Sequence, residues 1–250
     1  MMERYERHLG LEKFGPQAQT KLRNGSALVV GLGGLGSPAA LYLVAAGIGR
    51  LGLMDDDVVS LSNLQRQILH ATDNLGEKKT ASAERKLKAL NPDVQLEVLA
   101  ERLTPENASA VISNYDFILI CTDNLASKYL ANDVCIQLGK PFSIAGVTAW
   151  QGQTMTHVKR SACYRCLFPE PDKTAVEDKS VFGPLVGIAG SVQAAECVKY
   201  LTETGELLID RLLTVDAQTL QFQCLEVKPS ENCPACSIAP WFTDLLAEAY

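Results

Sequence analysis

A group of closely spaced glycines near the N-terminus has the pattern of a phosphate-binding loop. Gly31, Gly33, Gly34 and Gly36 follow the apolar run "ALVV" and precede a second apolar stretch, so a buried strand should turn into a helix there. Backbone N–H groups at such a helix N-terminus bind phosphates. In nucleotide-binding folds with such a loop, an acidic residue about 20 positions further along the chain binds the ribose. Asp55 stands at a suitable distance for that role. The pattern predicts a nucleotide site but leaves NAD, FAD, S-adenosylmethionine and ATP open.

Polar and basic side chains after Asp55 suit a longer phosphate chain. They are Asn63, Arg66 and Lys79. A triphosphate carries more charge than a pyrophosphate, and nucleotidyl transfer needs cations where negative charge develops. Arginine offers a two-pronged donor and lysine a point charge. The alternative is that Arg66 and Lys79 are solvated surface residues, and spacing alone leaves that alternative open.

An acid and an amide stand at the end of another expected strand. In "ILICTDN", Asp123 and Asn124 come directly after an apolar run. Ligands of open parallel sheets bind at the carboxyl ends of the strands. A carboxylate there can hold Mg²⁺ between phosphate oxygens. The alternative is that Asp123 caps the helix that follows, because aspartate is favoured at that position.

The eight cysteines divide into two close pairs and four single residues. The pairs, Cys163-x₂-Cys166 and Cys233-x₂-Cys236, supply four thiolates, which is the ligand set of a closed structural Zn²⁺ site. Two disulfides are the alternative, which fits less well in a chain without an export signal. The other cysteines lie in apolar segments and are expected to be inert core residues: Cys121, Cys135, Cys197 and Cys224.

Strand-like and helix-like segments alternate in the first part of the chain, which predicts an α/β fold. We expect a Rossmann-like, mainly parallel sheet with helices on both faces, plus a C-terminal antiparallel part tied by the zinc site. The expected strands are 27–30, 50–54, 94–99, 116–121 and 141–145, and the expected helices are 36–46, 77–90, 105–113, 124–138 and 184–202. Antiparallel strands are expected in "GQTMTHV" and "LLTVDAQTLQFQCLEV". Residues 169–181 are polar and should form a crossing loop.

Composition excludes several classes of protein. With 250 residues and 47% apolar content, the chain can bury the core of a single domain. A net charge of −6 argues against a nucleic-acid partner. The longest apolar run is too short to span a membrane, and the charged first residues do not look like a secretion signal. We therefore expect a cytoplasmic protein.

Several of these segments together resemble one enzyme family. "RYERH", "VVGLGGLGSPAALYL", "DDDVVSLSNLQRQ", "CTDN", "CYRCLFP" and "CPAC" are similar to the ThiF/MoeB/HesA adenylyltransferases, which are related to ubiquitin-activating enzymes. The resemblance runs from Arg4 to Cys236. It favours ATP over NAD and implies that the chain adenylylates the C-terminal glycine of a small ubiquitin-like sulfur-carrier protein ending in Gly-Gly. A separate sulfur donor would then convert the acyl-adenylate to a thiocarboxylate.

The resemblance also implies roles for individual residues. Arg7 would reach into the ATP site of the partner subunit of a homodimer, and Asp123 would hold Mg²⁺. Arg66 and Lys79 would contact the phosphates during catalysis. The remaining nucleotide-binding residues would be Gly34, Asp55, Ser62, Asn63, Leu64, Gln65 and Asn124. Residues 1–146 would form the nucleotide-binding part of one ThiF-type domain, and residues 147–250 the carrier-binding, crossing-loop and zinc part.

One position departs from the family pattern. Many relatives carry a further cysteine in the crossing loop, where this chain has Val176. A covalent enzyme–carrier step at that position is therefore not expected. The sequence looks closest to the thiamine-pathway members. Molybdopterin-pathway activation, adenylylation of a peptide for a natural product, an NAD-dependent oxidoreductase and a catalytically silent binding module remain as alternatives.

Overall fold

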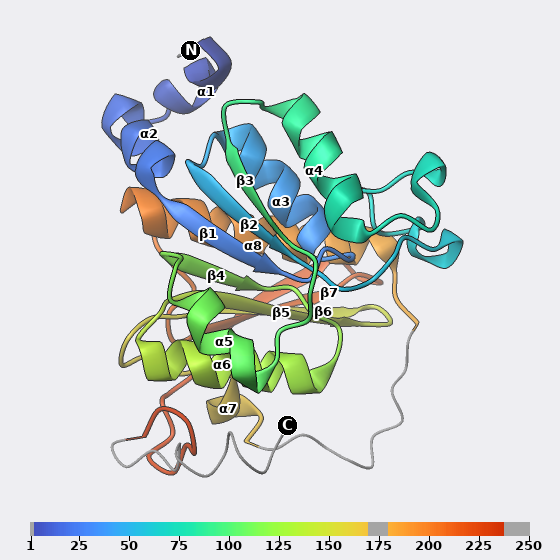
Figure 1. Ribbon diagram of the computed structural model, residues 1–250. Coiled ribbons are helices and arrows are strands. Elements are labelled where there is room, and N and C mark those ends of the chain that lie inside the picture. The colour runs from blue at the N-terminus through green and yellow to red at the C-terminus, as the bar shows by residue number, and fades with distance from the viewer. Residues whose placement is uncertain (1–2, 170–179, 238–250) are drawn as a thin grey trace.

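The computed structural model describes residues 3–169 and 180–237, and these form one eight-stranded sheet covered by helices on both faces (Figure 1). The strands are β1 Ser26–Val30, β2 Arg50–Met54, β3 Gln95–Leu99, β4 Phe117–Ile120, β5 Phe142–Thr148, β6 Gln151–His157, β7 Arg211–Asp216 and β8 Gln221–Glu226. The α-helices are α1 Glu6–Leu9, α2 Gly15–Asn24, α3 Gly36–Ala46, α4 Lys79–Leu90, α5 Pro105–Ile112, α6 Leu125–Leu138, α7 Tyr164–Leu167 and α8 Gly183–Thr202. Short 3₁₀ helices cover Glu3–Tyr5 (η1), Leu61–Asn63 (η2) and Thr72–Asn74 (η3).

The strand order is β3-β2-β1-β4-β5-β6-β7-β8. The first five strands in that order pair in parallel, whereas β5 to β8 pair antiparallel, as the sequence predicts. Between β1 and β4 the chain changes the direction in which it adds strands. In open α/β sheets, ligands bind at the carboxyl ends of the strands at such a switch point. The loops after β1 and β4 therefore form the expected ligand edge.

Two hydrophobic layers hold the sheet between its helices. One face packs against α3, α4 and α8, and includes Leu43, Leu87 and Val186. The other face packs against α5, α6 and α7, and includes Ile112 and Val134. In Figure 1 these two groups of helices lie on opposite sides of the strands. The central strands β1 and β4 are buried along their whole length, as strands covered on both faces must be.

Glycine is required at two positions of the loop after β1. Gly31 has a φ of +94°, and a Cβ atom there would lie 2.9 Å from the carbonyl oxygen of Cys121. A Cβ on Gly36 would lie 1.9 Å from the carbonyl oxygen of Gly31. The chain therefore turns from β1 into α3 along a path that no larger residue could follow. This turn brings the start of α3 directly over the carboxyl end of β1.

The crossing loop expected at residues 169–181 lies mostly outside the described residues, and so does Val176. Its C-terminal end is described from Ser180. There the N–H of Ala149 donates to the carbonyl of Ser180 at 2.8 Å, and the N–H of Phe182 donates to the carbonyl of Ala149 at 3.0 Å. The ring of Phe182 stacks on that of Trp150 with centroids 4.5 Å apart. The chain thus enters α8 attached to the turn between β5 and β6. No helix in residues 3–169 or 180–237 has the length and apolar character needed to cross a membrane.

Candidate nucleotide site and metal centre

Asp55 supports the glycine loop directly. One carboxylate oxygen accepts the N–H of Leu32 at 2.7 Å, and the other accepts the N–H of Asp57 at 2.9 Å. The expected ribose-binding acid therefore stands beside the loop at the end of β2. In the structure both of its oxygens also fix backbone conformation.

His70 supports the same loop from the other side. Its Nε2 lies 3.0 Å from the carbonyl oxygen of Leu32, and its Nδ1 lies 2.9 Å from the hydroxyl of Ser82 in α4. Burial lowers the pKa of His70, so the ring is neutral near pH 7. A neutral ring can donate one hydrogen bond, from Nε2 to the carbonyl of Leu32, while its Nδ1 lies against the hydroxyl of Ser82. The histidine ties the glycine loop to α4.

The segment that carries Arg66 runs between the glycine loop and α8. A Cβ on Gly34 would lie 2.6 Å from Val186 and 3.4 Å from the side chain of Arg66. A Cβ on Gly183, at the start of α8, would lie 2.7 Å from the carbonyl oxygen of Gln65. Both glycines therefore permit close packing. Arg66 is half-buried, and among the described residues its guanidinium donates only to the carbonyl of Ser62, at 3.2 Å.

Asn63 has a local structural role in the same segment. Its side-chain oxygen accepts the N–H of Ser60 at 3.3 Å and so caps η2. Leu64 follows as the C-terminal cap of that helix and is half-buried, whereas Ser62 and Gln65 are exposed. The segment therefore presents polar groups beside the glycine loop, as the sequence predicts.

Lys79 is buried and bonded to an acid that the sequence analysis did not single out. Only 5% of Lys79 is exposed, and its Nζ lies 2.9 Å from the carboxylate of Asp57. The alternative that Lys79 is a solvated surface residue is therefore wrong. Asp57 is the third acid of "DDD", and its position two residues after Asp55 was the available signal. The ion pair with Asp57 holds the ammonium of Lys79 at the carboxyl end of β2.

The structure separates the two possible roles of Asp123. The side chain that caps α6 belongs to Asn124, whose oxygen accepts the N–H of Ser127 at 2.8 Å. Asp123 is exposed at the end of β4, and its carboxylate forms no hydrogen bond or ion pair with the other described residues. The cap alternative for Asp123 is thus wrong, and its carboxylate is available for a cation.

Buried polar atoms without a partner gather at the same edge. In the described part of the chain they are Ser37 Oγ, Gln67 Oε1 and Thr122 Oγ1. Ser37 lies in the first turn of α3, the side chain of Gln67 lies beside Gly33, and Thr122 lies beside Gly31. A buried polar group that lacks a partner is costly, so a ligand or an ordered water is expected to satisfy these atoms. All three surround the glycine loop.

Arg7 lies at the opposite end of the sheet. It is exposed on α1, which follows the buried Tyr5. The Tyr5 hydroxyl accepts the side-chain N–H of Asn91 at 2.9 Å, and the ring packs against Gly47. Gly47 and Asn91 precede β2 and β3, so α1 is anchored at the amino ends of the strands (Figure 1). Arg7 therefore cannot approach the carboxyl edge of its own subunit.

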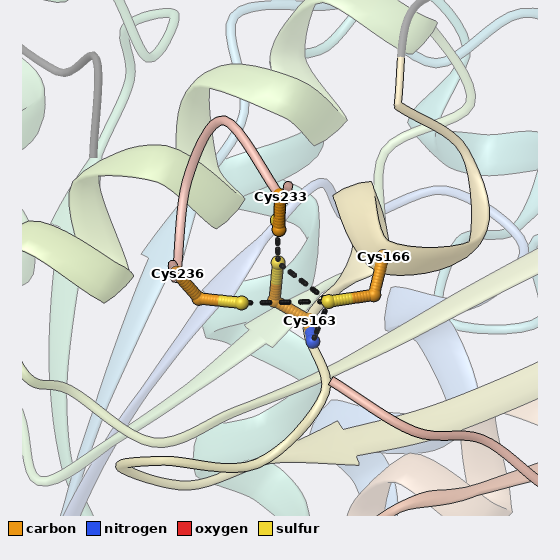
Figure 2. Close-up of side chains that lie close together, drawn as sticks. All are labelled: Cys163, Cys166, Cys233 and Cys236. Atoms are coloured by element: carbon orange, nitrogen blue, oxygen red, sulfur yellow. Dashed lines mark hydrogen bonds between the residues drawn. The ribbon is translucent and has the colours of Figure 1, made fainter. Parts of the chain in front are cut away.

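The two cysteine pairs come together into one cluster (Figure 2). The sulfur atoms of Cys163 and Cys233 lie 3.5 Å apart, those of Cys166 and Cys236 3.4 Å apart, and those of Cys163 and Cys166 4.0 Å apart. Four thiolates at Zn–S distances of about 2.3 Å in a tetrahedron have sulfurs about 3.8 Å apart. The cluster contains no disulfide. The donor set and its spacing fit a closed, structural zinc site.

The peptide between the first two cysteines is docked on α6. Arg165 forms a buried ion pair with Asp133, with donor–acceptor distances between 2.7 and 3.0 Å. The N–H of Tyr164 donates to the side chain of Asn132 at 3.0 Å. Arg165 also donates to the carbonyl of Pro169 at 2.8 Å. Helix α6 thus holds both the first cysteine pair and, through Arg165, the chain at Pro169.

The sequence predicts that the four single cysteines are buried in the core, and three of them are. Cys121, Cys135 and Cys197 are buried, and burial raises the pKa of each thiol. Cys224 is exposed, so its expected core position is wrong. It lies on β8, which is the edge strand and is exposed along its whole length. The apolar character of "FQCL" thus indicated a strand without indicating that the strand lies at the edge.

Comparisons with known proteins agree with this arrangement. The chain is 39% identical to a sulfur carrier protein adenylyltransferase from Thermus thermophilus, over 98% of this chain and 94% of that protein. It is 41% identical to a SAMP-activating enzyme E1 from Haloferax volcanii, over 94% of this chain and 88% of that protein. It is 42% identical to the adenylyltransferase and sulfurtransferase MOCS3 from Anopheles gambiae, of which it spans only 56%.

Among solved structures, E. coli MccB in complex with SeMet MccA matches with a TM-score of 0.83, covering 95% of this chain and 75% of that chain. At 21% identity this likeness shows a shared fold alone. Residues 5–235 match the ThiF family. Since that match covers most of the chain, and relatives near 40% identity span almost all of it, the chain belongs to the ThiF family.

Proposed function

We propose that this chain uses ATP to adenylylate the C-terminal glycine of a small ubiquitin-like sulfur-carrier protein, releasing pyrophosphate. The observation that carries the proposal is the carboxyl edge of the sheet. There Arg66 lies beside Gly34, the buried Lys79 is paired with Asp57, and the carboxylate of Asp123 pairs with no other described residue. The chain is also closely similar to a sulfur carrier protein adenylyltransferase. Cations on the phosphates and an acid for a metal are what nucleotidyl transfer requires.

ATP would bind along the loop after β1. Gly34 and the N–H groups at the start of α3 would lie against the phosphates, and Asp55 would bind the ribose. Arg66 and Lys79 would contact the phosphates, with Lys79 moving from Asp57 toward them. The other contacts would come from the neighbouring segment and from the end of β4, namely Ser62, Asn63, Leu64, Gln65 and Asn124.

The chemical step needs no nucleophile from the protein. A carboxylate oxygen of the carrier attacks the α-phosphorus of ATP and forms a new P–O bond. The bond between that phosphorus and the bridging oxygen breaks, and pyrophosphate leaves with the electron pair. Mg²⁺ held by Asp123 would neutralise charge on the phosphates. The protein contributes positioning and charge, and the acyl-adenylate is a good target for a persulfide sulfur on a separate donor.

The active unit we propose is a homodimer. Arg7 is anchored at the amino ends of the strands, so it can act at an ATP site only if that site belongs to the partner. Leu61 and Ile68 are 69% and 54% exposed on the segment that carries Arg66. Apolar side chains exposed beside a catalytic arginine suit an interface with a second copy.

The two parts of the chain would divide the work. Residues 1–146 would bind the nucleotide, and residues 147–250 would bind the carrier and, through the four cysteines, a structural zinc. Thiolate ligands suit a reducing compartment, which supports the cytoplasm as the location. Among carriers we favour one of the thiamine pathway. A molybdopterin-pathway carrier, or a peptide destined for a natural product, would use the same step.

The proposal is tested by ATP–pyrophosphate exchange with candidate carrier proteins ending in Gly-Gly. We expect exchange that depends on both the carrier and Mg²⁺ and disappears when the two terminal glycines are deleted. Exchange without any carrier would point to a different acceptor. Binding of NAD together with absence of exchange would favour an oxidoreductase and overturn the proposal.

A further inference from the structure

A second buried lysine stands at the ligand edge without a partner. Lys128 lies in the first turn of α6, and only 7% of it is exposed. Within residues 3–169 and 180–237 its ammonium forms no hydrogen bond and no ion pair. An isolated buried charge is costly unless something compensates for it. A bound anion would supply that compensation.

The Lys128 ammonium and a second donor point at one place. Its Nζ lies 3.4 Å from the position that a Cβ atom would take on Gly146, in β5. The side-chain nitrogen of Gln153, in the neighbouring strand β6, lies 3.3 Å from the same position. The side chain of Gln153 likewise forms no hydrogen bond to other described residues. A Cβ atom at residue 146 would crowd both donors, and glycine leaves them free of that contact.

This place adjoins the catalytic edge. Gly146 lies near the carboxyl end of β5, beside β4, whose end carries Asp123. Burial lowers the pKa of Lys128, and the charge of Asp123 acts in the opposite direction. The carboxylate of Asp123 is thus close enough to affect the lysine, although the two are not paired. An anion held by Lys128 would lie next to the metal and phosphates that we assign to Asp123.

A small cavity of about 10 Å³ lies beside Gly146 and Gln153. Tyr164 and Phe168 also line it. Phe168 stands just before the crossing loop. The cavity has room for only a water-sized group, so a side chain larger than that of glycine would not fit there.

We propose that Lys128 and Gln153 form the site that binds the terminal carboxylate of the acceptor polypeptide, over Gly146. This inference rests on the proposed function. One carboxylate oxygen accepts from the ammonium and the amide, which leaves the other directed at the α-phosphorus of ATP. The step itself is unchanged, since the new P–O bond forms as pyrophosphate leaves. Charge-assisted hydrogen bonds of this kind are strong and directional. The narrow approach selects chains that end in glycine.

The test compares Lys128→Met with wild-type protein, both carrying zinc. The probes are ATP alone, a Gly-Gly carrier that supports exchange, and the same carrier with its terminal carboxylate converted to an amide. We expect unchanged calorimetric ATP affinity and an increase of about 10- to 100-fold in the Kd and KM of the carrier. Wild-type protein should bind the carboxylate carrier more tightly than the amide carrier, and the variant should lose that preference. Lys128→Arg should recover part of it.

A second variant and a matched control separate this role from a structural one. Gly146→Ala places a methyl group against both donors and between them and the carboxylate, so it should weaken carrier binding while Lys128 keeps its charge. Lys140→Met removes a lysine that hydrogen-bonds Ser113 and Tyr115 at the amino ends of the strands, and it should leave the carboxylate preference intact.

Loss of ATP binding in Lys128→Met would make Lys128 a phosphate ligand and overturn the proposal. Unchanged carrier affinity, or a wild-type protein that does not distinguish carboxylate from amide, would overturn it as well. Failure of the proposed function itself would look different, because wild-type protein would then show no carrier-dependent exchange at all.

Discussion

Replacing Asp123 with alanine is expected to slow carrier-dependent ATP–pyrophosphate exchange on the order of 10²- to 10³-fold. The reason is that its carboxylate is the one acid at the end of β4, it serves no cap, and it forms no ion pair with the described residues. Arg66→Ala should have an effect of similar size, because it removes a preorganised cation from the phosphates. The initial rate of exchange at saturating carrier and ATP measures both.

Controls distinguish this loss from unfolding. Asp73→Ala removes an exposed acid in η3 and should leave exchange unchanged. Asn124→Ala removes the cap of α6 and should lower the free energy of unfolding by about 1 kcal/mol, whereas Asp123→Ala should leave it close to the wild-type value. Near-normal exchange in both Asp123→Ala and Arg66→Ala would remove the assignment of the site.

Mixing two inactive variants tests whether Arg7 acts on the partner. If it does, Arg7→Ala combined with Asp123→Ala should regain activity, because a heterodimer holds one site with both wild-type residues. Random pairing of equal amounts gives such sites at about one quarter of the wild-type number. Absence of recovery, despite subunit exchange demonstrated with tagged chains, would contradict the proposed role of Arg7.

The second large effect concerns the metal. Cys163→Ser should lower the zinc content from one per chain and reduce the free energy of unfolding by about 3–5 kcal/mol, since a structural zinc site contributes its binding energy to folding. The cluster joins the peptide after β6 to the segment after β8, and it is docked on α6 through Arg165 and Asp133. Urea unfolding and metal analysis of the same samples provide the measurement.

Cys224→Ser is the matched control for the metal. Its thiol is exposed on β8 and does not belong to the four-cysteine cluster, so zinc content should stay the same and stability should change by less than about 0.5 kcal/mol. A wild-type protein without metal and with two disulfides, or Cys163→Ser with normal stability, would show that the cluster is not a zinc site.

The fold could be predicted because apolar periodicity and glycine spacing are local signals. The expected helix 36–46 and strand 50–54 agree with α3 and β2, and most other expected ends differ by one or two residues. Asn124 illustrates the usual difference, since it was counted in the helix but caps it from outside. The four-cysteine cluster was also predictable, because two Cys-x₂-Cys pairs can form a Zn²⁺ site only by coming together.

Features that depend on burial could not be predicted in the same way. Lys79 and Lys128 look in sequence like ordinary solvated helix residues, yet the packing of α4 and α6 on the sheet buries both. The exposure of Cys224 follows from strand order, because β8 pairs only with β7. Which of two adjacent polar residues caps α6 depends on backbone geometry, and that choice left Asp123 available.

The most direct test of the central claim is to follow the α-phosphate of ATP. Purified protein is incubated with a Gly-Gly carrier and ATP labelled at the α-phosphate, and the carrier is separated under acidic conditions that preserve an acyl-adenylate. We predict label on the carrier, pyrophosphate released in equal amount, and neither product when the terminal glycines are missing. Label that stays on free nucleotide with every carrier, or pyrophosphate released without labelled carrier, would contradict the proposed adenylylation of a carrier carboxylate.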